Sequence, residues 1–295
     1  MARYREHAHR QDPSPPPMAL PPLACDCHVQ VIGPREVYPF AARAEYLPED
    51  APRAALFLRD ALLGLDRGVL VQASCHGADN ASLLDAVRLG DGAYRGVAIL
   101  DPRALEDGLV KLDRAHEHSA GIAGIRLDFS DRLHGRVSTE ERGAMIAAAA
   151  ARGWHLEVDA TPADLPAVQA LVESFPGKVV LTGLGRVAPG DTAGLSALCA
   201  QLRRAPRLWI KLNPLVGTSK APLQGGDIAA MTQALLTAAP DRAVWGTGWP
   251  HPQRDGAQPD DSALLGHLCA ACPDLALLRR VLVENATRLY WPGTA

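Results

Sequence analysis

Short apolar runs alternate with longer segments of helical period along most of this chain. Each candidate strand is rich in Val, Ile and Leu, and the runs are residues 25–32, 68–74, 96–100, 124–129, 155–159, 178–182, 208–212 and 243–247. Between them lie alanine- and leucine-rich segments such as "DNASLLDAVRLG", "EERGAMIAAAAARG" and "DIAAMTQALLTAA". This alternation predicts an α/β protein, a (β/α)8 TIM barrel rather than a doubly wound sheet.

The domain organisation follows from where the pattern begins. Residues 1–23 are rich in proline and polar residues and predict a flexible leader. Residues 24–295 contain no interior linker and no sequence repeat, so they predict a single domain. The leader lacks the apolar stretch of a secretory signal, and no run approaches the roughly 18 apolar residues of a membrane span. We therefore expect a cytoplasmic protein.

The composition limits the partners that the chain can have. Of its 295 residues, 47% are apolar and 21% are charged, and the formal net charge is −3. A balance so near neutral gives no reason to expect nucleic acid or a membrane as partner. The six cysteines fit reduced thiols, and "CAAC" at 269–272 has no second pair, so core packing is expected there.

In a barrel of this kind, functional residues lie at the C-terminal ends of the strands. The residues at those ends are His28, Gln30, Ser74, Cys75, His76, Asp101, Arg126, Asp128, Asp159, Thr182, Gly183, Lys211, Asn213 and the segment from Gly248 to His251. Alternation along "WHLEVD" puts His155, Glu157 and Asp159 on one face of the fifth strand. A barrel interior does not tolerate unpaired charge, so these carboxylates need a basic partner, for which Arg126 is the nearest candidate.

Six segments resemble, in the right order, the amidohydrolase superfamily: "DCHVQVIGP", "VQASCHGADNASLLDA", "GIRLDF", "VVLTGLGR", "WGTGWPHP" and "NATRLYW". More narrowly, they are similar to its branch that contains 2-pyrone-4,6-dicarboxylate lactonase. The resemblance implies His-x-His on the first strand, Asp-His on the sixth and, at the end of the eighth, an aspartate that acts as general base on water. It also implies that the lactonase branch works without metal and holds substrate carboxylates with arginine, serine and histidine.

The chain departs from this pattern at the residues that carry the chemistry. The first strand reads "HVQ", so His28 has lost its companion histidine, and the sixth ends in "TG". The eighth strand has Gly248 where the resemblance implies the base, and Asp159 stands where the branch has tyrosine. The loop "NPLVGTSK" lacks an arginine that the branch has there. Losing one positioned base typically costs on the order of 10²–10⁴ in rate, so inherited hydrolysis at full rate is not expected.

The departures also bear on metal binding. A catalytic zinc usually needs about three protein ligands, and only His28 of the implied set remains. A thiolate site from Cys27 and Cys75 is the alternative, but strand alternation turns Cys27 away from the barrel axis if His28 points toward it. We therefore expect no metal and no other cofactor.

The sequence thus gives two sets of candidate site residues. Candidate catalytic residues are His28, Asp159 and His251, and candidate substrate-binding residues are Ser74, His76, Arg126, Arg132 and Lys211. Asp159 near His28 would be a relocated acid/base pair, and a structural salt bridge is the alternative. Arg126 and Arg132 would bind a carboxylate, the alternatives being an internal ion pair and a solvated loop charge.

The remaining candidates have structural alternatives as well. Lys211 either contacts substrate or pairs with Asp128 or Asp159. His76 and His251 either contact substrate or make hydrogen bonds within the loops that carry them.

Three functional hypotheses follow. The first is a metal-independent enzyme that acts on a small carboxylated cyclic molecule, such as a lactone or pyrone, by hydrolysis, isomerisation, cyclisation or elimination. The second is a catalytically inactive ligand-binding or scaffold protein. The third is a residual hydrolase of the 2-pyrone-4,6-dicarboxylate type. The cluster of arginine and histidine at the barrel mouth favours the first, and the oligomeric state stays open.

Overall fold

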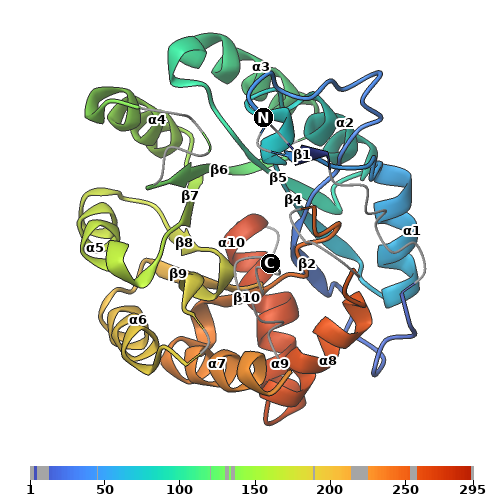
Figure 1. Ribbon diagram of the computed structural model, residues 1–295, viewed down its shortest axis with the longest axis vertical. Coiled ribbons are helices and arrows are strands. Elements are labelled where there is room, and N and C mark those ends of the chain that lie inside the picture. The colour runs from blue at the N-terminus through green and yellow to red at the C-terminus, as the bar shows by residue number, and fades with distance from the viewer. Residues whose placement is uncertain are drawn as a thin grey trace.

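Eight parallel strands form a nearly closed barrel with helices around it (Figure 1). The computed structural model describes residues 3–4, 13–44, 46–119, 121–129, 133, 137–188, 190–213, 225–252 and 258–293. The barrel strands are β2 (Cys25–Val29), β4 (Arg67–Val71), β5 (Tyr94–Ala98), β6 (Ile122–Asp128), β7 (His155–Asp159), β8 (Val179–Leu181), β9 (Leu208–Leu212) and β10 (Ala243–Trp245). Each of the eight runs predicted from the sequence overlaps one of them, so the predicted fold is confirmed.

The barrel closes between its last and first strands through residues just beyond β10. Trp249 forms a parallel bridge with Val29, and the amide of Gly248 donates a 2.8 Å hydrogen bond to the carbonyl of His28. Gly246 makes this approach possible, because a Cβ there would lie 2.5 Å from the amide nitrogen of His28. The segment "WGTGWPHP" is therefore fixed directly against the strand that carries His28.

The helices lie on the outside of the barrel, except for the last one. The outer helices are α1 (Arg53–Leu63), α2 (Ala81–Leu89), α3 (Leu105–Ser119), α4 (Thr139–Ala151), α5 (Leu165–Ser174), α6 (Thr192–Arg204), α7 (Gly225–Ala238), α8 (Asp261–Ala271) and α9 (Leu275–Arg279). Short 3-10 turns are η1 (Ser74–His76), η2 (Pro102–Ala104), η3 (Pro162–Asp164), η4 (Gly183–Arg186) and η5 (Pro240–Arg242), and η6 (Arg280–Glu284) is a π-helical turn. The final helix, α10 (Asn285–Tyr290), lies across the centre of the ring in Figure 1.

The interior of the barrel forms a core separate from the layer between strands and helices. Its apolar residues are Cys25, Cys27, Val69, Val71, Val97, Val180, Trp209 and Val244, together with Ala286, Leu289, Tyr290 and Trp291 from the end of the chain. The expectation that Cys27 points away from the axis was wrong. The register of β2 against β4 shifts between Asp26 and Val29, and such a bulge interrupts strict alternation of side chains.

The part of the leader that the structure describes is attached to the domain. Strand β1 (Arg3–Tyr4) pairs with β3 (Tyr46–Leu47) in a second, two-stranded sheet. Farther along, Ser14 donates hydrogen bonds to Asp260, just before α8. Within the described residues, no helix is long and apolar enough to cross a membrane.

Packing inside the barrel leads to a first prediction, which concerns Gly124. A Cβ at Gly124 would lie 2.5 Å from the ring of His155, which is buried and stacks edge-on against Tyr290. Gly124→Ala should therefore cost about 1–3 kcal/mol of unfolding free energy, measured by urea denaturation. Gly143→Ala is the control, because Gly143 is exposed in α4 and a Cβ there meets nothing. The control should gain about 0.5–1 kcal/mol, and equal effects of both changes would contradict the packing argument.

Candidate functional site

The C-terminal ends of the strands bring most of the predicted residues to one end of the barrel. On β6 and β7, Arg126 is the register partner of Glu157, and Asp128 is the register partner of Asp159. Register partners on parallel strands point to the same side of the sheet. Glu157 reaches the other polar groups inside the barrel, so these residues share its inner face.

His28 lies on β2 with its imidazole almost fully buried, at 4% exposure. Its Nδ1 is 3.5 Å from Oε1 of Glu157. Among the residues that the structure describes, neither of these two atoms has a hydrogen-bond partner of good geometry. Because Nδ1 faces the carboxylate, Nε2 is the ring nitrogen left for a ligand at the mouth.

Lys211 lies on β9 and pairs with a different carboxylate from those expected. From the sequence, Lys211 was expected either to contact substrate or to pair with Asp128 or Asp159. Instead, its Nζ donates a 2.7 Å hydrogen bond to Oε2 of Glu157. Both side chains have 0% exposure. Lys211 therefore neutralises a buried carboxylate and acts on any substrate only through its neighbours.

The electrostatics of this pair determine the charge on His28. Burial raises the pKa of Glu157, but Lys211, with His155 and His28, outweighs burial and holds that pKa well below its usual range. Burial lowers the pKa of His28 well below its usual value, and the charge of Lys211 lowers it further, although Glu157 opposes this change. His28 is therefore neutral at neutral pH and able to accept a proton.

Asp159 ends β7 and forms an ion pair that the sequence did not suggest. The expected partner was Arg126, but both Nε and Nη2 of Arg186 donate to the Asp159 carboxylate, Nη2 at 2.7 Å from Oδ2. Arg186 comes from η4, directly after β8, and has a left-handed backbone with φ 49°. The carboxylate that reaches His28 is that of Glu157, so this bidentate pairing favours the structural salt bridge for Asp159.

Arg126 lies at the mouth, half-buried, and its guanidinium makes a backbone contact. Nη1 donates a 2.6 Å hydrogen bond to the carbonyl of Gln72, at the end of β4. Its positive charge is near enough to His28 to lower the pKa of that imidazole. This position suits a carboxylate-binding group. Arg132 lies outside the described residues.

Ser74 and His76 lie in η1 and make contacts within the loops around them. The hydroxyl of Ser74 is 3.1 Å from that of Tyr46. His76 is buried; its Nδ1 is 3.1 Å from the carbonyl oxygen of Pro39, and its Nε2 accepts a hydrogen bond from the amide of Gly33. Both ring nitrogens are therefore engaged, and burial lowers the pKa of the imidazole. This geometry favours the structural alternative for His76.

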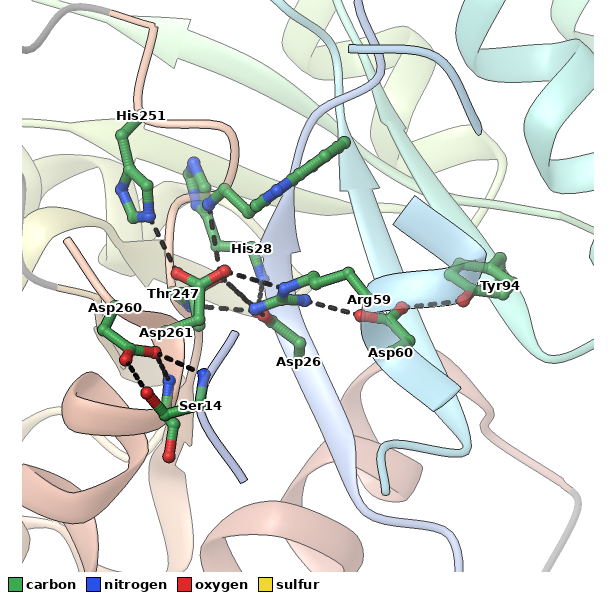
Figure 2. Close-up of polar contacts among 12 residues, drawn as sticks. Ser14, Asp26, His28, Arg59, Asp60, Tyr94, Thr247, His251, Asp260 and Asp261 are labelled. Carbon is green, nitrogen blue, oxygen red and sulfur yellow. Dashed lines mark hydrogen bonds and ion pairs between the residues drawn. The ribbon is translucent and has the colours of Figure 1, made fainter. Parts of the chain in front are cut away.

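His251 belongs to a buried network that continues behind the mouth (Figure 2). Its Nε2 is 2.8 Å from Oδ1 of Asp261, the first residue of α8. The other oxygen of Asp261 accepts a 2.8 Å hydrogen bond from Nε of Arg59, in α1. The Arg59 guanidinium also donates to Asp60 at 2.5 Å and to Asp26 at 2.8 Å. One guanidinium thus connects three carboxylates to a histidine at the mouth.

Three carboxylates around one cation leave an excess of negative charge, which changes their protonation. Burial raises the pKa of Asp60 to about 7, although Arg59 and a hydrogen bond from Tyr94 oppose the increase. For Asp261, burial also raises the pKa, but Arg59 and His251 bring it to about 2. Asp261 therefore stays ionised at neutral pH, and Asp60 takes up a proton near pH 7.

The sequence reasoning missed Arg59, Asp261 and Arg186. For Arg59 a signal was present, because Arg59 and Asp60 interrupt the apolar face of α1 between Leu56 and Leu63. A charged pair on the buried face of a helix indicates an internal network. Asp261 follows another aspartate at the start of α8, where acidic residues are expected at any helix N-terminus and give no functional signal.

The donor groups at the mouth do not fit a metal ion. In the described ranges, no group of at least three His, Cys, Asp or Glu side chains could hold one. Lys211 also places a positive charge where His28 and Glu157 meet, which opposes a bound cation. The aspartate that the family resemblance implies as a ligand is replaced by Gly248, whose φ of +83° is a conformation that disfavours aspartate.

Comparisons with known proteins agree with this fold and with the resemblance. The Amidohydro_2 family model, described as amidohydrolase, matches residues 25–291. A protein of Comamonas testosteroni named 2-pyrone-4,6-dicarbaxylate hydrolase is 34% identical over 292 residues, which cover 95% of this chain and 94% of that protein. A 4-sulfomuconolactone hydrolase of Rhizobium radiobacter is 30% identical, over 94% of this chain and 93% of its own. The apo structure of an Agrobacterium tumefaciens protein aligns with a TM-score of 0.79 at 28% identity, covering 96% of this chain and 98% of its own.

Proposed function

Because the chain belongs to the amidohydrolase family, we propose that it is an enzyme that opens or rearranges a small carboxylated lactone or pyrone without a metal ion. The names of two relatives describe hydrolases of a pyrone dicarboxylate and of a sulfonated lactone. Both substrates carry anionic groups on a ring with an ester bond. A site that combines a cation with a neutral proton acceptor suits this chemistry.

The position of His28 against Glu157 is the observation that carries the proposal. Its Nδ1 faces Glu157, whose charge is balanced by Lys211, so Nε2 is the proton-accepting atom at the mouth. An imidazole oriented by a carboxylate is a recurrent arrangement for acid/base catalysis. No step requires Asp159 as a base, since Arg186 holds its carboxylate.

Arg126 supplies the cation that this substrate class requires. Among the described residues, the carbonyl of Gln72 accepts from Nη1 of its guanidinium, and the further N–H groups of an arginine can bind a substrate carboxylate. A carboxylate bound there would place the ring beside His28, because the charge of Arg126 already acts on that imidazole. The site therefore favours ring substrates that carry at least one carboxylate.

The proposal is tested by turnover of a panel of carboxylated lactones and pyrones that includes 2-pyrone-4,6-dicarboxylate. Ring opening is followed by loss of ring absorbance, and isomerisation by NMR of the product. We expect turnover of at least one member and a loss of about 10²–10⁴ in rate for His28→Gln. If a panel member binds, as seen by a thermal shift, but none is turned over, the proposal that the protein is an enzyme would be contradicted. That result would support the inactive ligand-binding protein that the glycine at position 248 suggests.

Removal of the guanidinium should weaken substrate binding. Arg126→Met should raise KM for a carboxylated substrate by about 10–100-fold, because a charged hydrogen bond is worth about 1.5–3 kcal/mol. The matched control is Arg207→Met, since Arg207 also donates a 2.6 Å hydrogen bond to a backbone carbonyl, that of Val172, and a longer one to that of Glu173. Arg207 directly precedes β9, at the opposite end of the barrel. Equal KM values for the two variants would show that Arg126 does not bind the substrate carboxylate.

A further inference from the structure

The two ring nitrogens of His251 have different neighbours: Nε2 contacts Asp261, and Nδ1 lies near Gly248. Nε2 is 2.8 Å from Oδ1 of Asp261, and an ionised carboxylate only accepts hydrogen bonds. In the uncharged form of the ring, Nε2 therefore carries the proton and Nδ1 holds the lone pair. A Cβ at Gly248 would lie 3.8 Å from Nδ1, so this nitrogen lies next to the space where a side chain at position 248 would begin.

Asp261 is fixed in the arrangement that gives His251 this tautomer. Its second oxygen, Oδ2, accepts from Nε of Arg59 at 2.8 Å. Arg59 is fully buried and cannot turn away, since Asp60 and Asp26 hold its two terminal nitrogens. The groups that face His251 from neighbouring elements are thus Asp261, with Arg59 behind it, and His28 on β2, whose imidazole is neutral.

We propose that Nδ1 of His251 is the proton acceptor that replaces the missing carboxylate at position 248, and that Asp261 and Arg59 are positioning residues that fix its tautomer. This inference rests on the proposed function. In lactone opening, Nδ1 takes a proton from the attacking water, and Nε2 of His28 orients that water by accepting its other hydrogen. The water oxygen bonds to the ring carbonyl carbon at the same time. The ring C–O bond then breaks, and the leaving oxygen receives that proton from the imidazolium, which Asp261 stabilises.

Asp261→Asn tests the positioning role. Nε of Arg59 can only donate, so it takes the amide oxygen of the new side chain and leaves the NH2 group facing Nε2 of His251. Nε2 must then accept, the ring proton moves to Nδ1, and the lone pair at Gly248 is lost. We expect kcat for the best substrate of the panel to fall by about 10²–10⁴ while KM changes little. A variant that keeps the rate of the native protein would overturn the proposal.

The tautomer is measured separately from activity by NMR of ¹⁵N-histidine-labelled protein. The native protein should show His251 protonated at Nε2, and Asp261→Asn should show it protonated at Nδ1. A native ring protonated at Nδ1 would overturn the inference even if the proposed function holds. If no lactone is turned over, the proposed function fails, while the NMR result still decides the arrangement of Arg59, Asp261 and His251.

A second variant avoids the buried network altogether. Gly248→Ala places a methyl group 3.8 Å from Nδ1, in the path of the attacking water, and should lower kcat by about tenfold or more. Its backbone strain is matched by Gly92→Ala, because Gly92 has φ +82° against +83° and a Cβ there meets nothing. Both variants should lose similar stability, and only Gly248→Ala should lose activity. Equal activity in the two variants would contradict the proposed position of the base.

Discussion

Lys211→Met is expected to lower the free energy of unfolding by about 3–5 kcal/mol, because it leaves Glu157 charged and unpaired inside the barrel. The two groups are 2.7 Å apart, and neither side chain is exposed. Methionine has nearly the volume of lysine, so the loss of stability would come from the unpaired charge and not from altered packing. Urea unfolding followed by tryptophan fluorescence measures it. Lys178→Met should cost far less, because it removes a half-buried lysine that donates to the carbonyl of Arg288 and lies over the ring of Trp209.

The pH dependence of stability tests whether the unpaired charge of Glu157 causes the loss of stability in Lys211→Met. In the native protein the pKa of Glu157 is held below its usual value, so the pair contributes stability above the unfolded pKa and loses it as pH falls. In Lys211→Met, burial would raise that pKa instead, so the variant would be most stable in acid and lose stability as pH rises. The deficit of the variant should therefore shrink on going from pH 8 to pH 5.

A double variant separates the charge from the position. Glu157→Met combined with Lys211→Met removes both charges and should recover most of the stability that the single variant loses, since a buried ion pair is often no better than apolar residues of equal volume. The double variant should still be inactive, because His28 has lost the carboxylate that orients it. If it were no more stable than Lys211→Met, the unpaired carboxylate would not be the cause.

The fold could be predicted because its signal is local. Each barrel strand is a short apolar run between helical segments, and the alternation allows few other architectures. The bulge in β2 could not be predicted, because nothing in "CDCHVQ" marks where the register against β4 shifts. That shift reversed the expected direction of Cys27, although the prediction that His28 faces the interior did not depend on it.

The residues at the site were predictable, but their partners were not. Strand alternation correctly put Glu157 on the inner face of β7, but the carboxylate expected beside His28 was Asp159. The expected basic partner of Asp159 was Arg126, and Lys211 was expected to pair with Asp128 or Asp159. Asp159 pairs with Arg186 because a left-handed turn after β8 brings that side chain back to the mouth. Such turns are set by tertiary packing and have no reliable signature in a single sequence.

Arg59 and Asp261 illustrate the limit most clearly. They lie 202 residues apart, on helices that precede and follow the barrel closure, and they meet only because β10 returns to β2. The sequence located His251 at the mouth but gave no means of telling which of its nitrogens would face the ligand. That orientation depends on a contact that exists only once the barrel has closed.

Arg59→Met should have the largest effect on stability of the changes considered, because it orphans three buried carboxylates at once. Asp26, Asp60 and Asp261 each accept from the guanidinium at 2.5–2.8 Å. Breaking a single buried pair typically costs about 3–5 kcal/mol, which is a large part of the stability of a domain. We expect the variant to be unfolded at pH 8 by circular dichroism. Arg152→Met, which breaks a partly exposed pair with Asp113, should cost about 1 kcal/mol or less.

Acid should partly restore the fold of Arg59→Met, because protonation removes the unpaired charge of the buried carboxylates. In the native protein the pKa of Asp60 is about 7, above its unfolded value, so its contribution to stability is greatest in acid and is lost as pH rises through 7. Without Arg59, Asp261 would behave in the same way, because burial raises its pKa. The variant should therefore regain structure near pH 5. If it were equally unfolded at pH 5 and pH 8, the defect would lie in packing, and the charge network would not be what holds His251 in place.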